Sequence, residues 1–462
     1  MRHKQHLLWI GFAAALMLNS CQGSGRATII PASPTIALPS PTETAVSSTV
    51  TPSLEATTDP SACPPLDADI RSQLTEIDSQ VTQLRGLLPS NSVSRSLLTS
   101  DQLRERVLQD FLGDYTQEDA LQEVRLLSLF GLLEPGIDLW QIYADLLSEQ
   151  IAGFYDTEND DMTVICGSGF GGVERLTYAH EYAHVLQDQI FDIQDGLLYN
   201  NDACADDGER CSAVQALIEG DATLLQEQWL RTFAGDEDLS DLLEFLTAFE
   251  MPVFDGAPTY IQSELTFPYF WGLHFVRSLY LEGGWAAVDA AYQNPPLSSE
   301  QILHPERYPK DAPVDLVAPD SADEINSEWE KPVHDVLGEW VTLMLLNEYL
   351  PQDQASVAAE GWGGDLLLFF DQEEDSGEAL ALITQWDTMR DAHEFSAAFQ
   401  DYGLARFGDP ENSSTTSATW IYEDGISFFE RVSNQTLWIL APDEQMLEIL
   451  QKAIPLPVRT SS

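Results

Sequence analysis

Two histidines and a glutamate in the segment His180-Glu181-Tyr182-Ala183-His184 have the spacing of a metal site on a helix. Residues four apart lie on one face of an α-helix, so both imidazoles can bind the same ion. Glu181 can reach a water molecule on that ion and act as its general base. The alternative is a pair of surface histidines on a helix. An apolar stripe beside the histidines favours a buried helix and contains Leu176, Ala179, Ala183, Leu186 and Ile190.

A catalytic zinc ion needs a third protein ligand and an open position for water. Glu219, in the segment Ala216 to Thr223, is the best candidate, although it is one of 76 acidic residues. Apolar residues at helical spacing predict that this segment is a helix with a buried face. The small residues around Glu219 would let two helices pack closely enough to share a metal ion; they are Ala216, Gly220, Ala222 and Thr223.

The HExxH sequence on one helix and a glutamate on a later helix resemble the gluzincin peptidases. The resemblance covers about residues 146–310 and implies one zinc ion bound by His180, His184 and Glu219. The separation of the last two ligands (219 − 184 = 35) is longer than in the thermolysin-like and aminopeptidase families, and the insert 192–211 accounts for the extra length. No GAMEN-like segment precedes the histidines. The chain looks closest to bacterial lipoproteins of unknown substrate that carry HExxH and EGDA segments.

The same resemblance suggests a group that stabilises the oxyanion. In gluzincin aminopeptidases, a tyrosine in a Pro-Tyr-x-x-Gly helix start has this role, and Tyr269 occupies such a segment 89 residues after His180 (269 − 180 = 89). The alternative for Tyr269 is an aromatic residue at a helix start with proline in the first turn. His304 is the rival for the role, or a structural residue. Asp188 and Asp221 are candidates for orienting the histidines.

The N-terminal residues 1–20 have the pattern of a secretion signal, with basic residues followed by an apolar stretch from Leu7 to Leu18. This stretch is shorter than the ~20 residues that span a bilayer. It ends at a segment that resembles the lipobox of bacterial lipoproteins, which implies cleavage before Cys21 and lipidation of its thiol. The alternative is an ordinary signal peptide with a chance cysteine. Residues 21–65 are rich in Pro, Ser and Thr and predict a disordered linker.

The cysteine content indicates which disulfides can form, and the net charge limits which molecules the chain can bind. Lipidation of Cys21 would leave four cysteines, and an even number in an exported chain suggests disulfides. Cys204 and Cys211 are close enough for a local disulfide, leaving Cys63 and Cys166, although three pairings are possible. The net charge of −55 excludes nucleic acid as a partner.

We expect an α+β fold that is mostly helical. Residues 66–145 predict helices. The resemblance to the gluzincin peptidases implies a zincin-like metallopeptidase domain over residues 146–330. That domain should begin with two strands, Ile151–Tyr155 and Met162–Ile165, and the second is the expected open edge for a peptide. A helix should follow from about Val173.

Residues 331–462 predict a smaller α/β domain without assigned chemistry. The expected helices cover 336–350 and 391–402, and the expected strands cover 365–370, 379–383, 418–422, 426–431 and 436–440.

These patterns predict a membrane-anchored, extracytoplasmic zinc metallopeptidase on the outer face of a bacterial membrane. It would hydrolyse peptide or protein substrates through zinc-bound water, with Glu181 as base and Tyr269 or His304 at the oxyanion. The alternative is a non-catalytic lipoprotein that binds peptides or envelope components on a peptidase-like fold. Glu181 argues against this alternative, because a binding protein has no need of a general base.

Overall fold

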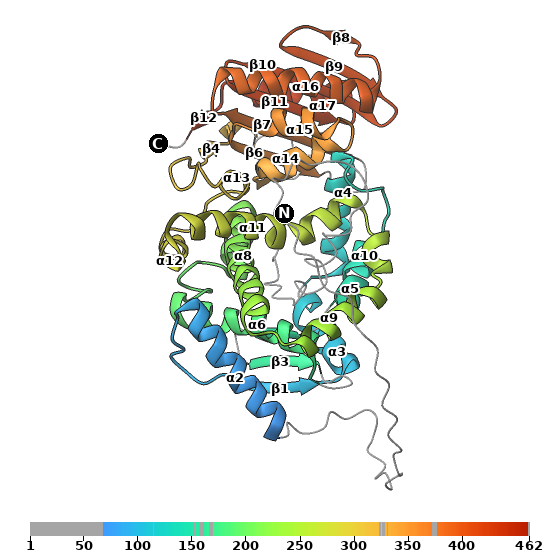
Figure 1. The fold of residues 1–462 in the computed structure, drawn as a ribbon. Coiled ribbons are helices and arrows are strands. Elements are labelled where there is room, and N and C mark those ends of the chain that lie inside the picture. Colours follow the sequence, from blue (N-terminus) through green and yellow to red (C-terminus); the bar gives the residue numbers. More distant parts are fainter. Residues whose placement is uncertain are drawn as a thin grey trace, which may run out of the picture.

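A computed structural model describes residues 68–113, 115–150, 153–156, 161–165, 170–322, 325, 329, 331–371 and 377–460 (Figure 1). This part of the chain combines many helices with three β-sheets, which confirms the α+β class. The predicted signal peptide, the linker, and Cys21, Cys63 and Cys166 lie outside the described residues. None of the described helices is both long enough and apolar enough to cross a lipid bilayer.

A small sheet contains the two strands expected before the HExxH helix. β2 (Gly153–Asp156) and β3 (Asp161–Ile165) pair antiparallel, and β1 (Ser94–Leu98) pairs parallel to β3 on its other side. The prediction of helices alone over 66–145 is therefore wrong at β1, because pairing with β3 outweighs local preference there. The prediction that Met162–Ile165 is an open edge is also wrong. β3 is the central strand, and β2 is the edge nearer the HExxH helix.

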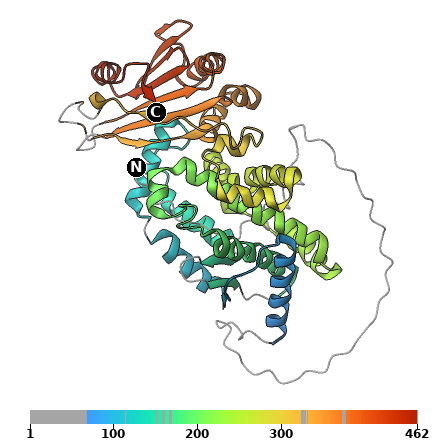
Figure 2. The ribbon, with the colours of Figure 1, turned by 90° about the vertical axis from the view of Figure 1, so that its left-hand side faces the viewer.

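Helices form most of the described part of the chain between residues 68 and 303 (Figures 1 and 2). Before the HExxH segment they are α2 (Ala68–Arg85), α3 (Ser100–Leu112), α4 (Gln117–Phe130) and α5 (Leu139–Gln150). From that segment on they are α6 (Gly172–Phe191), α7 (Asn201–Asp206), α8 (Gly208–Phe233), α9 (Asp236–Ala248), α10 (Pro252–Gly256), α11 (Thr259–Gly283), α12 (Trp285–Gln293) and α13 (Ser299–Leu303). The HExxH segment is thus on α6 and Glu219 is on α8, as predicted.

Two glycines set the approach of α8 to α11. A Cβ atom added to Gly220 would lie 2.1 Å from Gly272 O, and one added to Gly272 would lie 2.1 Å from Ala216 O. The small residues around Glu219 therefore allow close packing, but at Gly220 and Ala216 the neighbour is α11 and not α6, the helix expected to share the metal ion. α11 differs from the expectation in one respect: Pro268 and Tyr269 lie inside this long helix and not at its start.

The C-terminal residues form an antiparallel sheet in the order β5-β6-β7-β11-β10-β9-β8. The strands are β5 (Val333–Asp335), β6 (Trp362–Asp371), β7 (Glu378–Trp386), β8 (Asn412–Ser413), β9 (Ser417–Tyr422), β10 (Gly425–Val432) and β11 (Gln435–Ala441). The associated helices are α14 (Gly338–Asn347), α15 (Gln352–Ala359), α16 (Met389–Phe407) and α17 (Glu444–Ala453). A short 3₁₀ turn, η1 (Asp320–Ala322), and a strand pair, β4 (Leu316–Val317) with β12 (Arg459–Thr460), complete the region. The predicted helices and strands of this region are confirmed.

Both faces of this sheet are covered (Figure 2). Alternate residues of β6, such as Leu367 and Phe369, pack in the cluster that contains α16, whereas Leu366 and Leu368 pack in the cluster that contains α17. Strands buried on both faces contain continuous apolar runs, which explains why the sequence predicted them well.

Helix α4 packs against the C-terminal sheet although it lies far away in the sequence (Figure 1). The Phe130 ring lies 5.7 Å from that of Trp438, and Arg406 donates to Phe130 O at 2.8 Å. Arg125 forms ion pairs with Asp371 and Glu378. The C-terminal sheet therefore shares a hydrophobic core with the N-terminal helices.

A buried glutamate connects the start of α8 to α13 and α14. Glu209 Oε1 accepts hydrogen bonds from the backbone N–H and the hydroxyl of Ser299, both at 2.6 Å. Gly338 lies so close that an added Cβ would be 2.2 Å from the Glu209 carboxyl carbon. Burial raises the pKa of Glu209 to about 8, and nearby Asp365 contributes to the increase. The protonated carboxyl is therefore the form that this junction favours near neutral pH.

We predict that stability falls as the pH rises toward 8. The pKa of Glu209 is higher in the folded than in the unfolded chain, so its contribution is complete below about pH 4.5 and is lost as the pH passes 8. Between about pH 4.5 and pH 8, the ionisation of Glu209 lowers the free energy of unfolding by up to about 1.4 kcal/mol per pH unit. Glu209→Gln should reduce this slope, as measured by urea unfolding from pH 5 to 9. The control is Glu237→Gln, at an exposed position. Identical slopes in Glu209→Gln and the unmodified chain would contradict this prediction.

Candidate metal centre

Three predicted ligands converge between α6 and α8. His180 Nε2 lies 3.2 Å from Glu219 Oε2 and 3.1 Å from His184 Nε2, and His184 Nε2 lies 3.6 Å from Glu219 Oε2. All three side chains are at most 1% exposed. Ligand atoms of a tetrahedral zinc site lie about 3.4 Å apart when each bond is ~2.1 Å long. The observed spacings therefore suit one metal ion bound by two nitrogens and one oxygen.

Buried atoms without partners support this interpretation. Oε1 of Glu219 and Oε1 of Glu181 are buried and have no hydrogen-bond partner within the described part of the chain. A buried carboxylate oxygen without a partner is costly, and active sites are where proteins tolerate such groups. The donor set and these free oxygens fit a catalytic metal site, which keeps one position open.

The charges of the ligands influence one another. Burial raises the pKa of Glu219, but the two histidines outweigh burial and keep this pKa below its usual value. Burial lowers the pKa of His184, whereas Glu219 and Glu181 raise it above its usual value. For His180 burial prevails, and its pKa is lowered. Glu219 is thus a carboxylate, as a divalent cation requires, whereas His184 must give up a proton when a cation binds.

Glu181 interacts electrostatically with His184 and Glu219, and the small sheet orients its side chain. The backbone N–H of Tyr155 on β2 donates to Glu181 Oε2 at 3.1 Å, which leaves Oε1 free. Burial raises the pKa of Glu181 to about 8, and Glu219 also contributes. A carboxylate with a pKa near neutrality is suited to both accepting and returning a proton.

Two tyrosines lie next to Glu219. The ring of Tyr269 on α11 lies 6.4 Å from that of His180, centroid to centroid. Burial, followed by Glu219 and Glu181, raises the pKa of Tyr269, so its hydroxyl stays protonated. Tyr199 is 4% exposed, and burial and Glu219 also raise its pKa. Tyr199 is not predicted from the sequence, because it lies in the insert, which has no helical or strand pattern.

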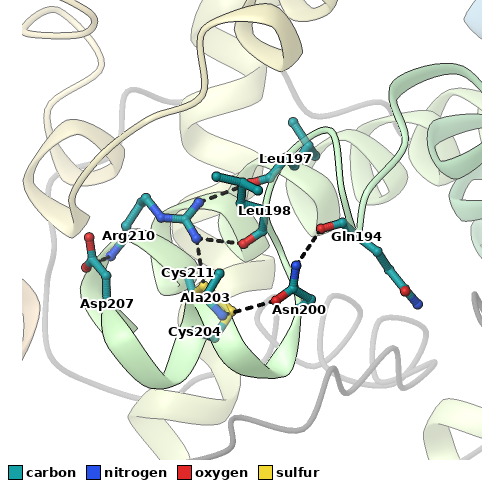
Figure 3. The surroundings of a disulfide bond; sticks show 9 residues. All are labelled: Gln194, Leu197, Leu198, Asn200, Ala203, Cys204, Asp207, Arg210 and Cys211. Atoms are coloured by element: carbon teal, nitrogen blue, oxygen red, sulfur yellow. Dashed lines mark hydrogen bonds between the residues drawn. A yellow bond between two sulfur atoms is a disulfide. The ribbon is translucent and has the colours of Figure 1, made fainter.

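The insert that carries Tyr199 is held in place by a disulfide and a local hydrogen-bond network (Figure 3). Cys204 and Cys211 form the predicted disulfide. Arg210 donates to Leu197 O at 3.0 Å and to Leu198 O at 2.7 Å, just before Tyr199. The insert is therefore an ordered segment that borders the candidate site.

The remaining candidate residues lie elsewhere. His304 Nε2 lies 2.9 Å from Glu339 Oε1, and its side chain is 22% exposed. Asp188 accepts a hydrogen bond from the Tyr155 hydroxyl at 3.1 Å. The expectation that Asp221 orients the histidines is wrong, because Arg85 and Tyr292 bind its carboxylate.

A second group of acidic residues also has ligand atoms close together: Glu300, Asp311 and Asp387. Here Arg307 supplies the positive charge, since its guanidinium lies 2.6 Å from Glu300 and 3.8 Å from Asp387. Arg307 thus offsets part of the negative charge, and burial raises the pKa of Glu300 to about 9 and that of Asp387 to about 6.

Among the comparisons with known proteins, one family model matches, and it covers the C-terminal region. Residues 326–451 match the family model of a domain of unknown function, DUF8575. No curated protein and no solved structure matches the chain. The matched range includes β5 to β11 and most of α17, and it excludes His180, His184 and Glu219.

We predict that Asp221→Ala destabilises the fold by about 3 kcal/mol, because it leaves the buried guanidinium of Arg85 without a main partner. Since Asp221 does not contact the histidines, the folded variant should keep the metal affinity of the unmodified chain. Urea unfolding and zinc titration measure the two effects. The control is Asp289→Ala, which removes the more exposed partner of Arg85. A loss of zinc affinity in folded Asp221→Ala comparable to that of a ligand variant would restore the orienting role.

Proposed function

We propose that this chain is a zinc metallopeptidase with a gluzincin-type site in a zincin-like domain over residues 146–330. The observation that carries the proposal is the convergence of His180, His184 and Glu219 at spacings of 3.1–3.6 Å, beside a glutamate with a free oxygen. Zinc at this site would supply a Lewis acid and lower the pKa of water that it binds.

In this proposal, Glu181 is the general base. Tyr155 N–H fixes one carboxylate oxygen, and the other oxygen has no hydrogen-bond partner among the described residues. Glu181 accepts a proton from the attacking water and returns it to the leaving amine. The Tyr269 hydroxyl donates a hydrogen bond to the oxyanion that develops on the peptide carbonyl.

The substrate is a peptide or a protein segment in extended conformation. β2 is the edge of the small sheet, and its residue Tyr155 contacts Glu181 directly. A substrate strand next to β2 would bring its backbone close to the base. The lipobox-like segment at Cys21 supports a lipid anchor on the outer face of a bacterial membrane, with the linker holding the folded part away from the surface.

We predict that Glu181→Gln binds zinc in the same amount as the unmodified chain but loses turnover by about 10²–10⁴-fold, because only the base is removed. Metal content is measured by mass spectrometry after dialysis, and hydrolysis with an unbiased peptide mixture. The variant His180→Ala/His184→Ala should retain no zinc, and Glu244→Gln, at an exposed position, is the control. Zinc retained by the double variant would refute the metal site, and full hydrolysis by Glu181→Gln would refute the base. Zinc binding without hydrolysis in the unmodified chain would favour the non-catalytic alternative.

We predict that Tyr269→Phe lowers kcat by about 10²-fold or more, with unchanged zinc content and little change in KM, because only a hydrogen bond to the oxyanion is lost. The control is Tyr280→Phe, on the same helix, whose ring packs on Trp285. His304→Ala in the same assay tests the rival residue. A normal kcat for Tyr269→Phe would exclude its role, and a comparable loss in His304→Ala would assign that role to the histidine.

A further inference from the structure

Gln187 on α6 connects a predicted ligand to the neighbouring helix. Its side chain is 1% exposed and makes two hydrogen bonds. Nε2 donates to Ile218 O on α8 at 3.0 Å, and Oε1 lies 2.8 Å from His184 Nδ1. Ile218 directly precedes Glu219. One buried amide thus touches His184 and the backbone that carries the third ligand.

The donor and acceptor in each of these two bonds determine which ring nitrogen of His184 carries the proton. A backbone carbonyl can only accept, so the Gln187 NH₂ group must face Ile218 O. The amide oxygen then faces His184, and Nδ1 must carry the proton that it donates. A neutral imidazole protonated at Nδ1 has its lone pair on Nε2. That nitrogen is the one that faces His180 and Glu219.

We propose that Gln187 is a positioning residue for the metal site, which fixes the tautomer of His184 and its distance from Glu219. Carboxylates or backbone carbonyls usually orient a histidine ligand. An amide does so here without adding negative charge, and its second bond joins the two helices that carry the ligands. Asp188 and Asp221 are the residues predicted to orient the histidines; the amide of Gln187 contacts His184 Nδ1 directly.

A second glutamine keeps the helices joined when Gln187 is changed. Gln226 on α8 is 4% exposed and donates through Nε2 to Leu176 O on α6 at 3.4 Å. α6 and α8 are therefore tied in both directions, and replacement of Gln187 leaves one tie intact. We expect Gln187 variants to fold, which makes their metal affinity measurable.

The test compares Gln187→Met with Gln187→Glu in the full chain. Methionine removes both hydrogen bonds, whereas glutamate keeps an acceptor for His184 Nδ1 and loses only the donor to Ile218 O. Zinc affinity is measured by competition with a chromophoric chelator, the geometry by the visible spectrum of the Co²⁺ form, and apo-protein stability by thermal unfolding. Gln189→Met is the matched control, because Gln189 is on the same helix and binds residues 90 and 91.

We expect Gln187→Met to weaken zinc binding by about 10–100-fold and to change the Co²⁺ spectrum. Gln187→Glu should keep both near the values of the unmodified chain while its stability falls. This inference rests on the proposed zinc site, and the two fail differently: absence of zinc binding by the unmodified chain would overturn the site itself. Zinc bound by the unmodified chain and equally well by Gln187→Met, with only stability reduced, would show that Gln187 is a structural tie and would overturn this inference alone.

Discussion

Backbone contact between α8 and α11 at Gly220 and Gly272 determines where the candidate site can form. Any side chain at either glycine would meet a carbonyl oxygen about 2 Å away, so these helices can approach this closely only with glycine at both positions. Glu219 precedes one glycine, and Tyr269 is one helical turn before the other. The close approach therefore brings a predicted ligand and a hydroxyl group together. If the helices were farther apart, Tyr269 would lie beyond reach of the ligands.

The buried carboxylates around the site differ in whether all their oxygens have hydrogen-bond partners. Asp221 is buried, and the Arg85 guanidinium and the Tyr292 hydroxyl satisfy its carboxylate. Glu181 and Glu219 are buried as deeply, yet each keeps an oxygen without a partner. A fold that satisfies one carboxylate and leaves oxygens free on two others nearby has kept those oxygens available for a ligand. Glu264 and Glu339 also keep a buried oxygen without a partner, so it is the convergence of Glu219 with two histidines that distinguishes the site.

The sequence predicted the ligand set because its signal is local. His180 and His184 are four residues apart on one helix, and the small residues around Glu219 indicate a close helix contact without any knowledge of the partner. Other features depend on contacts between distant segments. β1 exists because it pairs with β3, and Asp221 is held by Arg85, 136 residues earlier in the chain. Gln187 could have been found from its helical spacing, since it lies one turn after His184. Tyr199 left no periodic signal, because an irregular insert positions it.

Helix α8 connects the site with the rest of the molecule. At its start Glu209 contacts Ser299 and lies against Gly338, which is at the start of α14 and within the range matched by DUF8575. Ten residues further along, at a rise of about 1.5 Å per residue, the same helix carries Glu219. Asp221 then fixes it to α2 and α12 through Arg85 and Tyr292. Glu219 thus lies between two anchored points on one rigid helix. Because one of these points is the junction with the C-terminal region, that region helps to hold the third ligand in place, although it contributes no residue to the metal site.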